Sequence, residues 1–132
     1  MKRVEILLMI MSALFVVSCS SSAERVENVA DEFLTAHFQM DYERAYTLCT
    51  EEIATAIKEQ VESVTMPEDT LLLAKIKEAS ENTQFEVVGV NLKSKDTAYV
   101  SYTITPFASE SKIESRMILI KRDKDWRVYS LQ

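Results

Sequence analysis

The chain contains one histidine, and His37 is therefore the first residue to consider for acid–base chemistry. It lies on the apolar stripe of a predicted helix, and Tyr46 and Tyr102 fall at positions whose spacing also turns them toward the core. A buried imidazole can titrate near neutral pH and act as a base, with a tyrosine hydroxyl as the proton donor. Together with Trp126, these residues form the candidate pocket. The alternative interpretation is a core histidine among aromatic side chains that only fill volume.

The other residues of the sequence provide no further candidate for a catalytic group. The aspartates of the strand-rich half, Asp96, Asp123 and Asp125, all fall in predicted turns, so no inward carboxylate accompanies His37. The Gly-x-Ser-x-Gly motif of serine hydrolases does not occur, and Gly89 is the only glycine, whereas phosphate-binding loops need several.

Metal ligands are equally scarce. One histidine and one cysteine besides Cys19 cannot supply the ligands of an ordinary zinc site. The turn at residues 123–125 is acidic but lacks the spacing of a calcium loop. We therefore expect no metal and no cofactor.

The amino-terminal residues have the pattern of a secretory signal. Lys2 and Arg3 precede residues 6–17, among which only Ser12 is polar. This run is shorter than the roughly 20 residues of a membrane span. The order Val16-Val17-Ser18-Cys19 resembles the lipobox of bacterial lipoproteins.

That resemblance implies cleavage after residue 18 and attachment of diacylglycerol and a further acyl chain, such as palmitate, to Cys19. Residues 19–24 would then be the lipidated cysteine and a flexible tether, and residues 25–132 a single domain. Because serine follows the cysteine, nothing indicates inner-membrane retention, and the outer membrane is favoured. The alternative is an ordinary secretory signal that happens to contain a cysteine.

The charge is distributed unevenly along the mature chain of 114 residues. Residues 19–132 carry 13 Lys and Arg against 20 Asp and Glu, a formal charge of −7, which argues against nucleic acid as a partner. The balance is −9 over residues 24–82 and +2 over residues 83–132. Either acidic helices are simply followed by strands that end in lysine, or the basic half faces an anionic ligand or surface. Cys49 has no partner for an intramolecular disulfide, and we expect a buried thiol.

Apolar periodicity divides the domain into helices followed by strands. Helices are expected at residues 24–38, 42–49, 51–64 and 71–79, with Asp41 and Thr50 as N-caps. Pro67 separates the last two of these helices, and the apolar run at residues 71–73 suggests a segment enclosed by other elements or by a partner. Strands are expected at residues 85–92, 97–105, 113–121 and 126–131, with a bulge or bend at Gly89.

Helices followed by an antiparallel meander predict an α+β fold with the helices on one sheet face. The segments DEFLTAHFQMDYERAYTLC, FEVVGVNL, TAYVSYTI and DKDWRVYSL resemble the nuclear-transport-factor-2-like, or cystatin-like, superfamily. More closely, they resemble the small lipoproteins of domain of unknown function 4878. The resemblance implies a cone in which a curved sheet of four or more antiparallel strands wraps around the helices. Some relatives use the pocket inside this cone for ligands or catalysis, and others leave it filled.

From these features we expect a membrane-anchored lipoprotein of the cell envelope that works by binding. Its ligand would be a small apolar molecule in the cone, or a protein partner or second copy on the sheet face that carries Tyr99, Ile118 and Ile120. The alternative is a small isomerase- or dehydratase-like enzyme that uses His37. Such an enzyme would lack the carboxylate base usual among relatives of that type, so we favour a protein that is not an enzyme.

Overall fold

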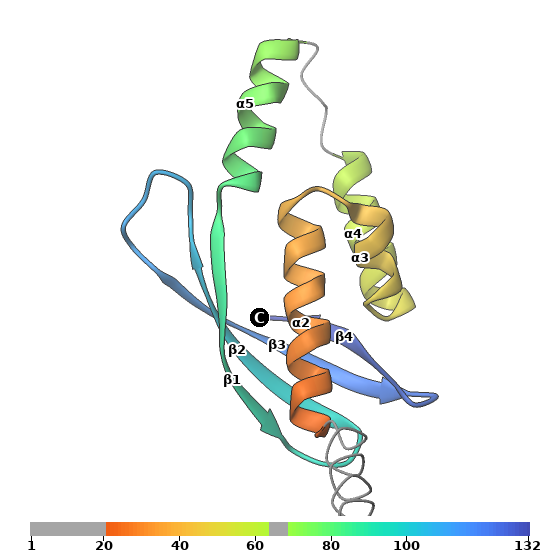
Figure 1. The fold of residues 1–132 in the computed structure, drawn as a ribbon. Coiled ribbons are helices and arrows are strands. Elements are labelled where there is room, and N and C mark those ends of the chain that lie inside the picture. Colours follow the sequence, from red (N-terminus) through yellow and green to blue (C-terminus); the bar gives the residue numbers. More distant parts are fainter. Residues whose placement is uncertain (1–20, 64–68) are drawn as a thin grey trace, which may run out of the picture.

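The computed structural model describes residues 21–63 and 69–132, which form helices packed against a four-stranded antiparallel sheet (Figure 1). The signal segment, Cys19 and Pro67 lie outside the described residues. The predicted α+β fold, with helices preceding an antiparallel meander, is confirmed. The elements that position the candidate sites are the strands and the first helix described, α2.

The sheet is a meander in the order β1-β2-β3-β4. Its strands are β1 (Gln84–Leu92), β2 (Thr97–Thr105), β3 (Ile113–Arg122) and β4 (Asp125–Leu131), each within one residue of its predicted bounds. In β2, Ala98, Val100 and Tyr102 are buried under the helices and alternate with exposed or half-buried residues. This period of two is why the sequence identified the inner face.

A bulge interrupts β1 near its middle, as the sequence predicted for Gly89. Val87 pairs with Tyr102 and Gly89 pairs with Ser101, so that Val88 is the extra residue. The φ angle of Gly89 is not positive. The site therefore does not need glycine for its backbone conformation, and the side chain of Val88 is left exposed.

Helix α2 (Ser22–Phe38) lies across the inner face of the sheet (Figure 1). Its N-cap is Ser21, whose side chain accepts a hydrogen bond from the backbone N–H of Glu24 at 3.2 Å. The helix thus begins two residues before the predicted start. Ser22 and Ala23, which the sequence assigned only to the flexible tether, are helical, because Ser21 caps the helix.

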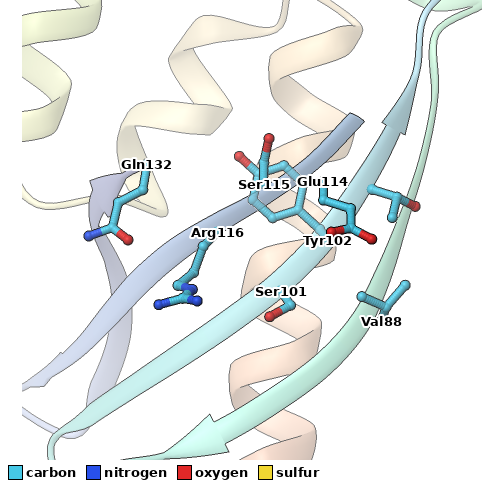
Figure 2. A pocket seen from close by; sticks show the side chains of 8 residues that line it. Val88, Ser101, Tyr102, Glu114, Ser115, Arg116 and Gln132 are labelled. Atoms are coloured by element: carbon cyan, nitrogen blue, oxygen red, sulfur yellow. The ribbon is translucent and has the colours of Figure 1, made fainter. Parts of the chain in front are cut away.

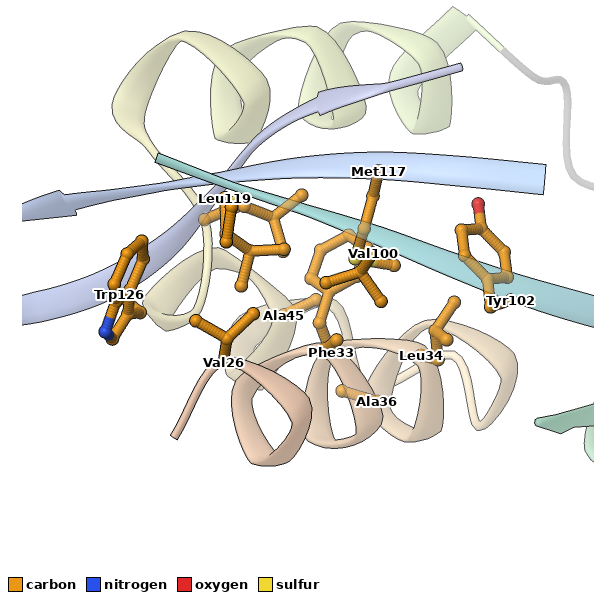
Figure 3. Packing of buried hydrophobic residues seen from close by; sticks show 14 of the residues in the cluster. Val26, Phe33, Leu34, Ala36, Ala45, Val100, Tyr102, Met117, Leu119 and Trp126 are labelled. Atoms are coloured by element: carbon orange, nitrogen blue, oxygen red, sulfur yellow. The ribbon is translucent and has the colours of Figure 1, made fainter. Parts of the chain in front are cut away.

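The buried stripe of α2 and the inner face of the sheet form the core (Figure 3). Phe33, Met117 and Leu119 are the largest side chains that are fully buried. Tyr102 and Trp126 are also buried, and Figure 3 shows Trp126 beside Val26 but Tyr102 near Leu34.

Two helices follow α2, of which the first packs against α2 and the second against β4. Helix α3 (Tyr42–Thr47) is capped by Asp41, as predicted, and α4 (Glu51–Ser63) begins directly after Thr50. The sequence predicted that this helix extends to Cys49, whereas α3 ends at Thr47. The chain there pairs with β4 instead: the N–H of Thr50 donates to the carbonyl of Val128 at 2.9 Å, and the N–H of Val128 donates to the carbonyl of Leu48 at 2.9 Å.

Helix α5 (Thr70–Glu81) projects from the body of the molecule (Figure 1). Its N-cap is Asp69, and none of its residues is buried. Leu71 is 65% exposed and Leu72 is 47% exposed. The expectation that other elements of the chain enclose this apolar run is wrong for the part of the chain that the structure describes.

Candidate functional site

His37 lies near the end of α2, against a cluster of aromatic rings. The centroid of its ring is 6.1 Å from that of Phe33, 5.3 Å from that of Phe38 and 6.2 Å from that of Tyr42. The ring of Phe38 in turn stacks on Phe85 of β1 at 5.6 Å. Nδ1 of His37 is buried and has no hydrogen-bond partner in the structure, and burial lowers the pKa of the imidazole below 6.5. Partial burial among apolar side chains therefore favours the neutral imidazole.

The other predicted pocket residues do not gather around His37. Trp126 packs beside Val26, eleven residues before His37 on α2, which corresponds to about 16 Å along the helix axis. Tyr46 is half-buried at the surface, with Nζ of Lys58 4.8 Å from its ring centroid. Burial raises the pKa of the Tyr46 hydroxyl and also that of Tyr102. A raised pKa keeps both phenols protonated at neutral pH.

Of this predicted set, Tyr102 borders a described hollow, although its side chain is buried on the inner face of the sheet. The hollow has a volume of about 630 Å³ and is formed mainly by β1, β2 and β3. Figure 2 shows it on the sheet, with α2 behind the strands. The residues that line it are Val88, Ser101, Tyr102, Thr103, Glu114, Ser115, Arg116 and Gln132.

A second hollow of about 290 Å³ adjoins the first and shares Ser101 and Arg116 with it. Its other lining residues come from the second half of β1 and from β2: Gly89, Val90, Asn91, Lys93 and Tyr99. Ser101, Arg116 and Tyr99 alternate with buried residues along their strands, so they lie on the face that the helices leave uncovered. We call the two hollows together the outer groove.

Tyr99 lies in the outer groove and has two cations close to its ring. Nζ of Lys93 is 5.1 Å from the centroid of its ring, and Cζ of Arg116 is 6.0 Å away. Attraction to the electrons of the ring helps to hold both cations over it. Both side chains are exposed, so an anionic group could approach them without the cost of burying an unpaired charge. This arrangement can bind a carboxylate or a phosphate beside an aromatic surface.

The sequence predicted part of this groove. Tyr99 was expected on a sheet face available for contacts, and residues 83–132 have a positive charge balance. The contact of Tyr99 with Lys93 and Arg116 was not predicted, because these two residues come from a turn and from a different strand. The signal that could have found them is the strand register: Arg116 pairs with Ser101, two residues from Tyr99, and is thus a diagonal neighbour.

The remaining predicted residues show no catalytic arrangement. Cys19 lies outside the described residues. Cys49 is buried as predicted, and burial raises the pKa of its thiol, which lowers its reactivity. No three acidic, histidine or cysteine residues of residues 21–63 and 69–132 cluster in a way that could hold a metal ion. Over the same residues, no helix has both the length and the apolar character needed to cross a bilayer.

No protein-family model matches the chain, and no curated protein matches it significantly.

Proposed function

We propose that this chain is a lipoprotein of the bacterial cell envelope, anchored through lipid on Cys19, with the outer membrane as the favoured location. Support comes from the order of features in the first 19 residues: positive charges, a short apolar run, a small residue and a cysteine. We also propose that its domain has the nuclear-transport-factor-2-like conical form. The α+β arrangement and the sequence segments quoted above support this, and the two proposals are independent of each other.

The domain acts as a binding module, and the outer groove is its binding surface. The observation that carries this proposal is that Lys93 and Arg116 both approach the ring of Tyr99 on the uncovered face of the sheet. The groove is polar and spans three strands, which suits an extended partner better than a small apolar ligand. A segment of a partner protein that presents carboxylates complements its two cations. A second copy of the chain on the same face is the competing partner.

Titration with a defined acidic peptide tests this function. A hexamer of glutamate is added to the isotopically labelled Cys19→Ala chain, and a hexamer of glutamine serves as the neutral comparison. We expect the glutamate peptide to shift amide resonances of β1, β2 and β3 on the outer face. Arg116→Gln should weaken binding by up to about fivefold, since an exposed charge pair contributes up to about 1 kcal/mol.

The matched control is Arg44→Gln, because Arg44 is an exposed arginine on α3 that pairs with Glu32 at 3.9 Å, outside the groove. The control should bind like the parent chain. Shifts centred on His37, or equal effects of the two arginine variants, would contradict the assignment. If the chain dimerises as its concentration rises and Arg116→Gln abolishes the dimer, the partner bound by the outer groove is a second copy of the chain and not an acidic segment.

The enzymatic alternative has one observation in its favour. Nδ1 of His37 is buried without a hydrogen-bond partner, and such atoms occur at catalytic sites as well as in cores. Against it, the rings of Phe33, Phe38 and Tyr42 lie against the half-buried imidazole, and His37 lines neither hollow of the outer groove. An isomerase or dehydratase needs room for substrate beside its base. Binding on the outer face is therefore the better-supported function.

A further inference from the structure

The rigid part of the domain begins almost at the proposed lipid. Ser21 caps α2, and only Ser20 separates Ser21 from Cys19. An extended chain advances at most about 3.5 Å per residue, so the Cα atoms of Cys19 and Ser21 are at most about 7 Å apart. With lipid on Cys19, as proposed above, the first turn of α2 is held at the surface of the bilayer.

Strand β1 runs antiparallel to α2 and continues beyond the start of that helix. Phe85, early in β1, stacks on Phe38 at the end of α2. Ala23 and Glu24, at the start of α2, line a hollow together with residues 87–90 of β1. Two more strand residues lead from Val90 to Leu92, the end of β1, or about 7 Å at about 3.3 Å per residue, and the turn follows. Figure 1 shows the turn between β1 and β2 at the same end of the molecule as the start of α2.

The side chains of this turn suit a membrane surface. Leu92 is 43% exposed, and Lys93, Ser94, Lys95 and Asp96 are exposed as well, so the turn carries two positive charges and one negative charge. An apolar side chain beside two lysines can lie at the boundary of headgroups and acyl chains, while the ammonium groups contact lipid phosphates. Glu24 and Glu27 also belong to this end of the molecule, and Glu24 lies in the first turn of α2, so its charge offsets part of the attraction of the lysines to anionic lipid.

We propose that residues 92–95 form a second membrane contact, directed at the anionic phospholipid of the same bilayer that holds the anchor. This contact rests on the proposed lipidation of Cys19. Two contacts fix an orientation that one flexible chain would leave free. Helix α2 then points away from the membrane.

The same orientation places α5 far from the bilayer. The hydroxyl of Ser80 donates to the carbonyl of Phe38 at 2.6 Å, which joins the end of α5 to the far end of α2. The 17 residues of α2 correspond to about 25 Å of helix. The exposed Leu71 and Leu72 of α5 are thereby presented on the side opposite the anchor.

Fluorescence quenching in vesicles tests this orientation. The full lipidated chain, with Cys49→Ala as background, carries a dye on Ser94→Cys or, as the control, on Glu78→Cys in α5. The vesicles contain phosphatidylcholine with or without phosphatidylglycerol, and a nitroxide is attached to a fraction of the headgroups. We expect several-fold stronger quenching at position 94 than at position 78, and a further increase with phosphatidylglycerol.

A variant that carries both Lys93→Gln and Lys95→Gln separates the contribution of the turn from that of the lipid anchor. Each lysine near an anionic surface contributes about fivefold in affinity, so the variant labelled at position 94 should lose the increase caused by phosphatidylglycerol. Equal quenching at positions 94 and 78, or an unchanged response of the lysine variant, would overturn the proposed contact. Mass spectrometry of the purified chain reports separately on the anchor. A Cys19 without lipid overturns both the proposed anchor and the second membrane contact. Lipid on Cys19 together with equal quenching at positions 94 and 78 overturns only the second membrane contact.

Discussion

Replacing His37 by phenylalanine distinguishes a structural imidazole from a catalytic one. The ring of His37 lies among those of Phe33, Phe38 and Tyr42, and its Nδ1 is buried without a partner. A phenyl ring keeps an aromatic group in this cluster and removes both the unpaired nitrogen and the titration. The variant should therefore fold, and its stability relative to the parent chain should depend on pH.

The sign follows from the direction of the pKa shift. Burial lowers the pKa of His37 in the folded state below its ordinary value of 6.5, so the unfolded chain binds more protons as pH falls through 6.5. The free energy of unfolding of the parent chain therefore decreases as pH falls below 6.5, and it is not reduced by His37 above that pH. For one proton the slope is at most about 1.4 kcal/mol per pH unit. His37→Phe lacks this loss, while groups that titrate alike in both chains cancel in the difference.

Urea denaturation at a series of pH values measures this difference, with the fluorescence of Trp126, the only tryptophan, as the signal. The difference in free energy of unfolding should be constant above about pH 7 and should increasingly favour His37→Phe toward about pH 5. A difference that does not vary with pH would show that His37 is not held neutral by burial. A variation of opposite sign would mean that the folded state stabilises the imidazolium, and acid–base chemistry at His37 would again be the better explanation.

Further predictions concern the stability of the bulge, the core and α5. A Cβ at Gly89 would meet nothing within 4 Å and its φ is not positive, so Gly89→Ala should raise the free energy of unfolding by about 0.4–1 kcal/mol; destabilisation in thermal denaturation would contradict this. Phe33 is 1% exposed, and Phe33→Ala should cost about 3–5 kcal/mol in urea denaturation, whereas a loss below 1 kcal/mol would mean that the core closes around the cavity. Leu72→Ser and Ile76→Ser, on exposed positions of α5, should each change stability by less than about 0.5 kcal/mol in the same assay; a loss of more than 1 kcal/mol would show that α5 is packed in solution.

Local patterns predicted most of the secondary structure because their causes are local. Alternation in β2 marks the inner face through Ala98, Val100 and Tyr102, and the side chain of Asp41 caps the helix that follows it. The bulge at Gly89 was predicted because glycine weakens a regular strand. The end of α3 was misplaced because a distant strand competes there: α3 stops before Cys49 because Val128 of β4 pairs with residues 48 and 50.

The residue types alone determined that this chain lacks the glycine-rich loops and the histidine and cysteine pairs that phosphate and zinc sites need. They also indicated an α+β fold, because apolar periodicity changes from that of helices to that of strands at residue 83. Only the tertiary structure determined which residues are in contact. His37 contacts rings from α2 and α3, and Lys93, Tyr99 and Arg116 converge from a turn and two strands. Periodicity states which face a side chain occupies, whereas strand register and helix packing determine its neighbours on that face.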